Sequence, residues 1–142
     1  MNSFDLFGQT ASHMFSLYEQ WIKTKGLNYS TLAVLHTLVK ENACTQKHIC
    51  KQWGLPKQTI SASCQKLHKD GLIAFSANGT DGREKQLHLT EQGKAVAEPL
   101  IDELNQIEQR AVQAFGEKRA ERFIQEMSRF VATLEKEINT VI

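Results

Sequence analysis

Residues 57–62 read Lys-Gln-Thr-Ile-Ser-Ala and are polar or small at every position except Ile60. In the major groove of DNA, glutamine pairs with an adenine edge, hydroxyl side chains contact bases or phosphates, and alanine meets a thymine methyl. The segment therefore predicts a helix that reads DNA through its N-terminal end. A helix face exposed only to solvent is the alternative interpretation.

A second candidate DNA contact follows at residues 81–85. Asp81-Gly82-Arg83 is a turn sequence that places an arginine at the tip of a hairpin, where it can enter a narrow minor groove. Asp81 can orient the guanidinium through a charge-assisted hydrogen bond. With phosphate partners included, the predicted DNA contacts are Thr45, Gln46, Lys57, Gln58, Thr59, Ser61, Ala62, Lys66, Arg83 and Lys85.

Three short helices must position the DNA-reading segment. We expect Ser30 and Thr45 to cap the first two helices, and Gly54 to form the tight turn before the third. Pro56 suits the first helical position of the third, because its missing N–H would be unpaired there. Apolar spacing predicts these helices over residues 31–41, 46–53 and 57–70, the order of a helix-turn-helix unit.

The sequence period changes after Gly71. Residues 72–76 and 86–89 are strand-like, and turn-forming residues separate them. The expected fold class is therefore mainly α with a small β-hairpin wing. Residues 29–94 form the predicted winged helix-turn-helix DNA-binding region.

Long amphipathic segments flank this region. Their apolar residues recur every three or four positions, and Pro99 should kink or break the helix that contains it. The region between them offers little surface to cover these stripes. Residues 1–28 and 95–142 are therefore predicted to form the dimerisation helices of a two-fold homodimer, within one compact domain per chain. A monomeric helical bundle is the alternative.

Composition narrows the function classes. The 142-residue chain has a net charge of only +1, but residues 45–94 carry +4 and residues 95–142 carry −3. The central part is the one suited to a polyanion. No run approaches the ~20 apolar residues of a membrane span, and no signal peptide is recognisable. A cytoplasmic protein without a membrane partner is expected.

Several motifs resemble the winged helix-turn-helix of the MarR (multiple-antibiotic-resistance regulator) family. They lie in residues 45–61, 67–73, 81–85 and 89–93, and the most specific are Asp81-x-Arg83 and Leu89-Thr90-x-x-Gly93. The resemblance covers essentially the whole chain, apart from a departure at Ala62-Ser63. It implies that Arg83 is the minor-groove contact, that Asp81 supports it and that residues 57–70 read the major groove.

The resemblance also implies a repressor of transcription that binds a pseudo-palindromic operator in double-stranded DNA as a homodimer. A small aromatic or phenolic effector would release it by binding between the dimer helices and the winged region. Candidate wall residues are Tyr18, Trp21 and His36. Aromatic residues at helical spacing are also common in ordinary cores.

Thiol sensing is an alternative signal. Cys44 and Cys50 are the candidates, because Lys47 and Lys51 could lower a thiolate pKa, whereas Cys64 lies on an apolar stripe and should be buried. The histidines show no i, i+4 pairing, so neither a metal nor another cofactor is expected. Without a phosphate loop, an H-E-x-x-H motif or a nucleophile elbow, an enzyme is not expected. A winged-helix module that binds protein instead of DNA is the remaining alternative.

Overall fold

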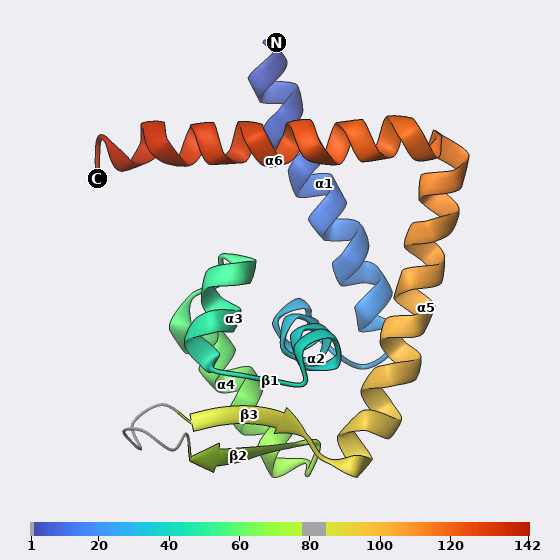
Figure 1. Cartoon of the computed structure of the whole chain (residues 1–142), viewed down its shortest axis with the longest axis vertical. Coiled ribbons are helices and arrows are strands. Elements are labelled where there is room, and N and C mark those ends of the chain that lie inside the picture. Colours follow the sequence, from blue (N-terminus) through green and yellow to red (C-terminus); the bar gives the residue numbers. More distant parts are fainter. Residues whose placement is uncertain (1, 78–84) are drawn as a thin grey trace. The chain divides into compact units, whose positions relative to one another are not determined.

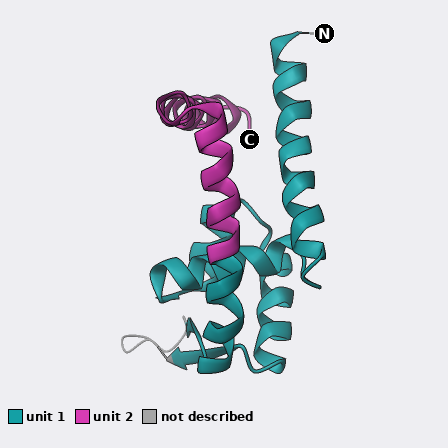
Figure 2. Cartoon of the chain, turned by 90° about the vertical axis from the view of Figure 1, so that its right-hand side faces the viewer, with its two compact units in different colours: residues 1–101 teal, residues 102–142 magenta. Residues whose placement is uncertain are grey.

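The computed structural model describes residues 2–77 and 85–142. It divides into two compact units, Met1–Ile101 and Asp102–Ile142, which Figure 2 distinguishes by colour. The elements follow in the order α1 (Ser3–Lys23), α2 (Tyr29–Glu41), β1 (Ala43–Cys44), α3 (Gln46–Trp53), α4 (Lys57–Lys69), β2 (Ile73–Ala77), β3 (Lys85–Leu89), α5 (Glu91–Phe115) and α6 (Glu117–Asn139). The expected mainly α fold with a small antiparallel sheet is confirmed.

Local signals set the helix boundaries. Thr45 caps α3 as expected, since its hydroxyl accepts a hydrogen bond from the N–H of His48 at 3.1 Å. Gly54 follows in a left-handed conformation, with φ at +64°, and turns the chain toward α4. Pro56 is the N-cap of α4, one position earlier than predicted, and Lys57 is the first helical residue.

The N-cap expected at Ser30 is wrong. Asn28 caps α2, because its side-chain oxygen accepts a hydrogen bond from the N–H of Thr31 at 2.9 Å. Ser30 lies inside the helix, where its hydroxyl is 2.6 Å from that of Ser63 on α4. Both serines are buried, so this hydrogen bond joins α2 to the helix predicted to read DNA.

The hairpin is confirmed, but the sheet has one more strand than the sequence predicts. Its order is β1-β3-β2, with antiparallel pairing throughout. Ala43 pairs with His88 and Ile73 with Leu89, so the short β1 joins the hairpin to the C-terminal end of α2. The sheet packs against α2 and α4 (Figure 1).

The core of the first unit surrounds α2. This helix is buried on almost every side, and it shares the core with apolar residues of all the neighbouring elements. The largest fully buried side chains of this core are Ile22, Leu32, Leu35, Leu38, Ile49, Ile60, Ile73, Leu87 and Ile101. The helix-turn-helix and the hairpin are thereby held in one packed body.

Three hydrogen bonds of Thr90 join the hairpin to α5. The hydroxyl of Thr90 donates to the carbonyl of Gly71 at 2.7 Å and accepts from the N–H of Gly93 at 3.0 Å. The N–H of Thr90 donates to the carbonyl of Leu72 at 3.0 Å. The Leu89-Thr90-x-x-Gly93 motif therefore caps α5 and holds its first turn against the end of α4.

Of the kink or break expected at Pro99, the break is wrong and the kink stays a prediction. Helix α5 continues from Glu91 to Phe115 with Pro99 in its interior. A proline removes one backbone hydrogen bond, and buried neighbours such as Ala97, Leu100 and Ile101 contribute packing that offsets this loss.

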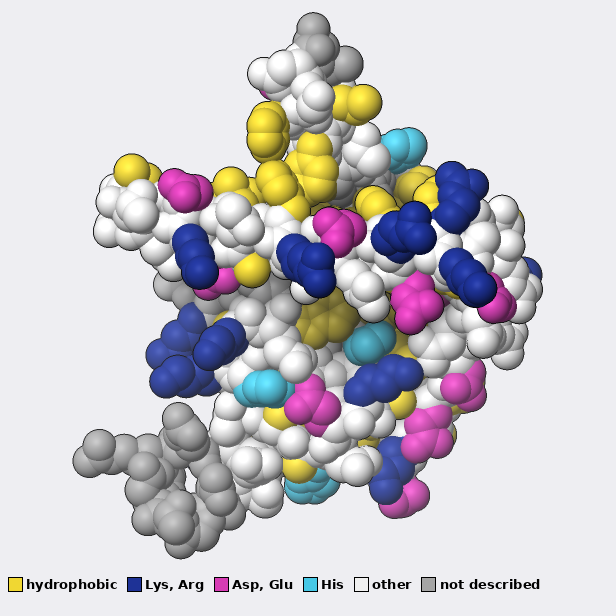
Figure 3. All heavy atoms as spheres, turned by 45° about the horizontal axis from the view of Figure 1, so that its top comes forward, with side chains coloured by type: hydrophobic (Ala, Val, Ile, Leu, Met, Phe, Trp, Pro, Cys, Tyr) yellow, Lys and Arg dark blue, Asp and Glu magenta, His cyan; other side chains and the backbone are white. Residues whose placement is uncertain are grey.

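Both terminal helices expose apolar side chains. On α1, Phe4, Leu6 and Phe15 are 65%, 56% and 47% exposed. Figure 3 shows hydrophobic side chains gathered on this N-terminal helix. In the second unit, exposed apolar residues of α6 recur at helical spacing: Phe123, Ile124, Val131, Leu134 and Ile138. Phe4, Phe123, Leu134 and Ile138 belong to the stripes from which dimerisation was predicted, and the other exposed residues widen this apolar surface.

Candidate nucleic-acid interface

The first two turns of α4 present a polar face to solvent. Lys57, Gln58, Thr59 and Ala62 are exposed and Ser61 is half-buried. On the opposite side of the helix, the buried residues are Ile60, Ser63, Cys64 and Leu67. Helical periodicity thus separates the groups expected to read bases from those that anchor the helix. Lys66 is exposed further along, where its ammonium lies 3.3 Å from the carboxylate of Asp70.

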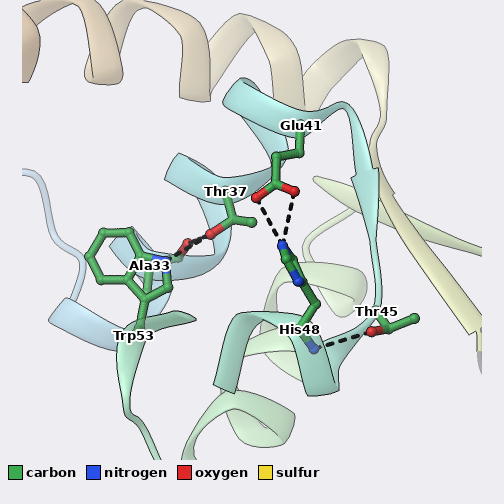
Figure 4. Close-up of polar contacts among 6 residues, drawn as sticks. All are labelled: Ala33, Thr37, Glu41, Thr45, His48 and Trp53. Atoms are coloured by element: carbon green, nitrogen blue, oxygen red, sulfur yellow. Dashed lines mark hydrogen bonds and ion pairs between the residues drawn. The ribbon is translucent and has the colours of Figure 1, made fainter. Parts of the chain in front are cut away.

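Helix α3 supports α4 and is itself fixed to α2 by two polar contacts (Figure 4). The indole N–H of Trp53 donates to the hydroxyl of Thr37 at 2.9 Å, and that hydroxyl donates to the carbonyl of Ala33 at 2.7 Å. At the other end, a ring nitrogen of His48 lies 2.9 and 3.0 Å from the two carboxylate oxygens of Glu41. These contacts fix both ends of α3.

The predicted contacts of α3, α4 and the hairpin meet at one cavity. It has a volume of about 580 Å³, and its described lining includes Thr45, Gln46, Lys57 and Lys85 from the predicted set. The remaining described lining residues, which sequence reasoning did not select as contacts, are Lys47, Cys50 and Phe75. The positive charge count of residues 45–94 was the one signal that pointed to Lys47.

The tip of the hairpin carries two further predictions. Asp81 and Arg83 lie outside the described residues, so the minor-groove contact and its supporting carboxylate stay predictions. Lys85, the first residue of β3, is exposed and its ammonium lies 6.0 Å from the centre of the Phe75 ring.

The three candidate effector residues occupy two different helices. Tyr18 and Trp21 are half-buried on α1, whereas His36 is half-buried on α2 with its ring 5.3 Å from that of Trp53. His36 lines a cavity of about 490 Å³ whose lining comes from α2 and α3. A ligand role for any of the three stays a prediction.

The cysteine environments differ. Cys64 is fully buried, as expected, and burial raises the pKa of its thiol to about 12. Cys44 is buried too, and desolvation together with the nearby Glu41 carboxylate raises the pKa of its thiol to about 11. Because the thiolate is the reactive form, these surroundings disfavour Cys44 as a redox sensor. Cys50 is half-buried at the cavity described above.

Neither a metal-binding cluster nor a membrane-spanning helix occurs in the described part of the chain. His, Cys, Asp and Glu side chains there do not gather in groups of three or more that suit a metal ion. Within the same residues, no helix combines the length and the hydropathy that a membrane crossing requires.

A helix-turn-helix followed by an antiparallel hairpin, with a polar helix face beside a basic cavity, defines the protein as a winged helix-turn-helix protein. The chain belongs to the MarR family, whose members are transcriptional regulators. The MarR family model matches residues 25–84. The chain is similar to a MarR family regulator from Neisseria meningitidis, with 37% identity, 98% of each chain covered and a TM-score of 0.88.

Two further relatives are more distant. The HTH-type transcriptional regulator SarZ of Staphylococcus aureus is 27% identical over 97 residues, which cover 68% of this chain and 66%, just under two thirds, of SarZ. BpsR of Bordetella bronchiseptica shares the fold at 20% identity, with a TM-score of 0.74 over 89% of this chain and 96% of its own. The BpsR structure concerns the mechanism by which 6-hydroxynicotinic acid regulates DNA binding of BpsR.

Proposed function

We propose that this MarR-family protein is a sequence-specific repressor that binds a pseudo-palindromic operator as a homodimer and leaves it when a small effector binds. The observation that carries the proposal is the face of α4, where Lys57, Gln58 and Thr59 are exposed while Ile60 is buried. In this geometry α4 enters the major groove, and residues at its N-terminal end reach the base edges.

The basic groups supply the contacts to the duplex backbone. Lys57 and Lys85 lie at the same cavity, and the N-terminal end of α3 with Thr45 and Gln46 borders it. Phosphate contacts of this kind set the register of a protein on DNA, and base contacts add specificity. Arg83 is proposed to add the minor-groove contact from the hairpin tip.

Dimerisation is proposed through the apolar faces of α1 and α6. Side chains such as Phe4 and Ile124 are more than half exposed in the single chain. Large exposed apolar surfaces mark interaction sites in proteins, and an isologous dimer covers one face with its own copy. Two copies of α4 then read two half-sites of a palindrome. The effector part of the proposal is supported by the small-molecule regulation described for BpsR.

Salt dependence tests DNA binding. The predicted set holds four basic residues per chain, so a dimer should show a slope of log affinity against log salt of about −5 to −7, because condensed counterions are released. Fluorescence anisotropy with a labelled fragment of the protein's own promoter measures this slope, with a scrambled fragment as control. Equal affinity for both fragments at every salt concentration would contradict the repressor and favour a protein-binding module.

Gln58→Ala tests the base-reading helix. This substitution should weaken operator binding by about 1–3 kcal/mol and relax the sequence preference at one position of each half-site, because a bidentate contact to a base is lost. Gln52→Ala is the matched control, since Gln52 is also exposed but lies on α3 outside the predicted contacts. If both variants bind like the wild type, α4 does not read bases through Gln58.

A further inference from the structure

A chain of hydrogen bonds links the start of α2 to the buried face of α4. The side-chain oxygen of Asn28 accepts from the N–H of Thr31 at 2.9 Å and from the hydroxyl of Ser30 at 2.9 Å. The hydroxyl oxygens of Ser30 and Ser63 lie 2.6 Å apart. Both serines are buried, so neither hydroxyl has bulk water at hand to replace a lost partner.

The direction of this chain follows from the acceptor at its end. The Asn28 oxygen cannot donate, so the single hydrogen of the Ser30 hydroxyl points to it. The Ser30 oxygen then remains as an acceptor, and Ser63 is the group that donates to it. The side chain of Ser63 on α4 is therefore held by Ser30, whose own orientation is set by the N-cap of α2.

Ser63 lies at one edge of the buried face of α4. At 3.6 residues per turn, Ile60 and Leu67 run along the middle of that face, and Cys64 lies at the opposite edge. Apolar burial has no preferred direction, whereas a hydrogen bond weakens steeply when its distance or angle changes. In the part of the chain that the structure describes, only Ser63 joins an α4 side chain to another element by a hydrogen bond. This contact is thus suited to fix the rotation of α4 about its own axis.

The rotation of α4 decides where its polar face lies. A rotation of about 10° moves a group that is ~6 Å from the helix axis by about 1 Å. A shift of that size is enough to break a hydrogen bond to a base edge. The exposed Gln58 and Thr59 lie about one turn before Ser63 on the same helix, so they follow any rotation that Ser63 permits.

We propose that Ser63 is a positioning residue for operator reading, which fixes the rotation of α4 through its hydrogen bond to Ser30. The consequence for DNA rests on the proposed DNA-binding function, whereas the rotation of α4 is a property of the free protein. Ala62-Ser63 is also the point at which the sequence departs from the family motifs. Because base contacts carry the sequence information and phosphate contacts do not, Ser63 acts on sequence preference more than on affinity for DNA in general.

The first experiment measures the orientation of α4 in the free protein. Residual dipolar couplings of backbone N–H groups report this orientation relative to α2 in NMR spectra. Ser63→Ala should alter the couplings of α4, because the helix is then free to rotate. Cys64→Ala is the matched control, since it removes packing at the opposite edge of the same face and should leave the couplings close to the wild type. Melting curves confirm that both variants fold. Wild-type couplings in Ser63→Ala would overturn the proposal.

The second experiment measures sequence preference with the promoter fragment and its scrambled control. Ser63→Ala should lower the affinity for the promoter fragment about fivefold, because binding must then restore the orientation of α4. The affinity for the scrambled fragment should stay within about twofold, since phosphate contacts dominate there. Cys64→Ala should keep the ratio of the two affinities although it lowers the melting temperature. An equal loss of this ratio in both variants would overturn the positioning role, because the effect would then follow stability.

A double-mutant cycle tests the connection through Ser30. Ser30→Ala removes the acceptor of Ser63, while Asn28 still accepts from the N–H of Thr31 and caps α2. Ser30→Ala combined with Ser63→Ala should therefore lose no more promoter affinity than Ser63→Ala alone. Losses that add in the double variant would overturn the connection between the two hydroxyls.

The two proposals fail in different ways. If the wild type binds the promoter and scrambled fragments alike, the repressor falls, and the dipolar couplings still decide whether Ser63 fixes α4. If the wild type prefers the promoter and Ser63→Ala keeps that preference, the positioning role is overturned while the repressor stands.

Discussion

Gly93→Ala is expected to destabilise the protein by about 3 kcal/mol or more, because a methyl group there has no space. A Cβ built on Gly93 would lie 1.9 Å from the carbonyl oxygen of Leu72 and 2.8 Å from its carbonyl carbon. These are backbone atoms, so no side-chain rotation relieves the clash. The same carbonyl accepts the hydrogen bond of the Thr90 N–H, so moving it also disturbs the junction between hairpin and α5.

Thermal unfolding followed by circular dichroism measures this effect. The midpoint should fall by roughly 10 °C. Gln92→Ala is the control, since Gln92 is the exposed neighbour of Gly93 in the same turn of α5. This variant should unfold close to the wild-type temperature. A Gly93→Ala protein as stable as the control would contradict the close approach of α5 to the Leu72 carbonyl.

Leu134→Glu combined with Ile138→Glu should convert the proposed dimer to a monomer. The two side chains are 40% and 45% exposed in the single chain and lie one turn apart on the apolar stripe of α6. If the stripe is the dimer interface, the substitutions bury four carboxylates in it and should raise the dimer dissociation constant about 100-fold or more. Sedimentation equilibrium measures that constant.

The matched control places two glutamates on the opposite face of α6. Gln125→Glu combined with Ala132→Glu affects exposed positions away from the stripe and should leave the dimer intact. Removal of residues 116–142 is the more drastic variant, which deletes α6 altogether. A stable dimer of that shortened chain would contradict an interface that includes α6, and an operator affinity unaffected by dimer loss would contradict binding to two half-sites.

The motif at residues 89–93 shows what the family resemblance contributed and what it left open. The sequence by itself favours Thr90 as the cap of α5, since a hydroxyl residue before an amphipathic stretch is a local signal. The sequence contained no sign that the same hydroxyl donates to the Gly71 carbonyl. It also did not show that the carbonyl of Leu72, twenty-one residues earlier, leaves no space for a side chain at Gly93. Those contacts join segments distant in sequence and are invisible to local patterns.

The strand β1 and the cap of α2 were missed for related reasons. A strand of two residues, Ala43–Cys44, is too short to show alternation, and pairing with His88 and Leu87 creates it. Asn28 and Ser30 are both favourable caps by residue type. Ser30 packs against Ser63 from inside the helix, so Asn28 is the residue left to cap it.

Periodicity and turn chemistry were sufficient to predict the helix-turn-helix, the hairpin and the polar face of α4, because helical and strand repeats depend on neighbouring residues alone. The cavity that joins Lys47, Lys57, Lys85 and Phe75 arises from three elements brought together by folding. The burial that raises the pKa of the Cys44 thiol has the same origin. Distances between segments far apart in sequence, and the desolvation they produce, exist only once the chain is packed.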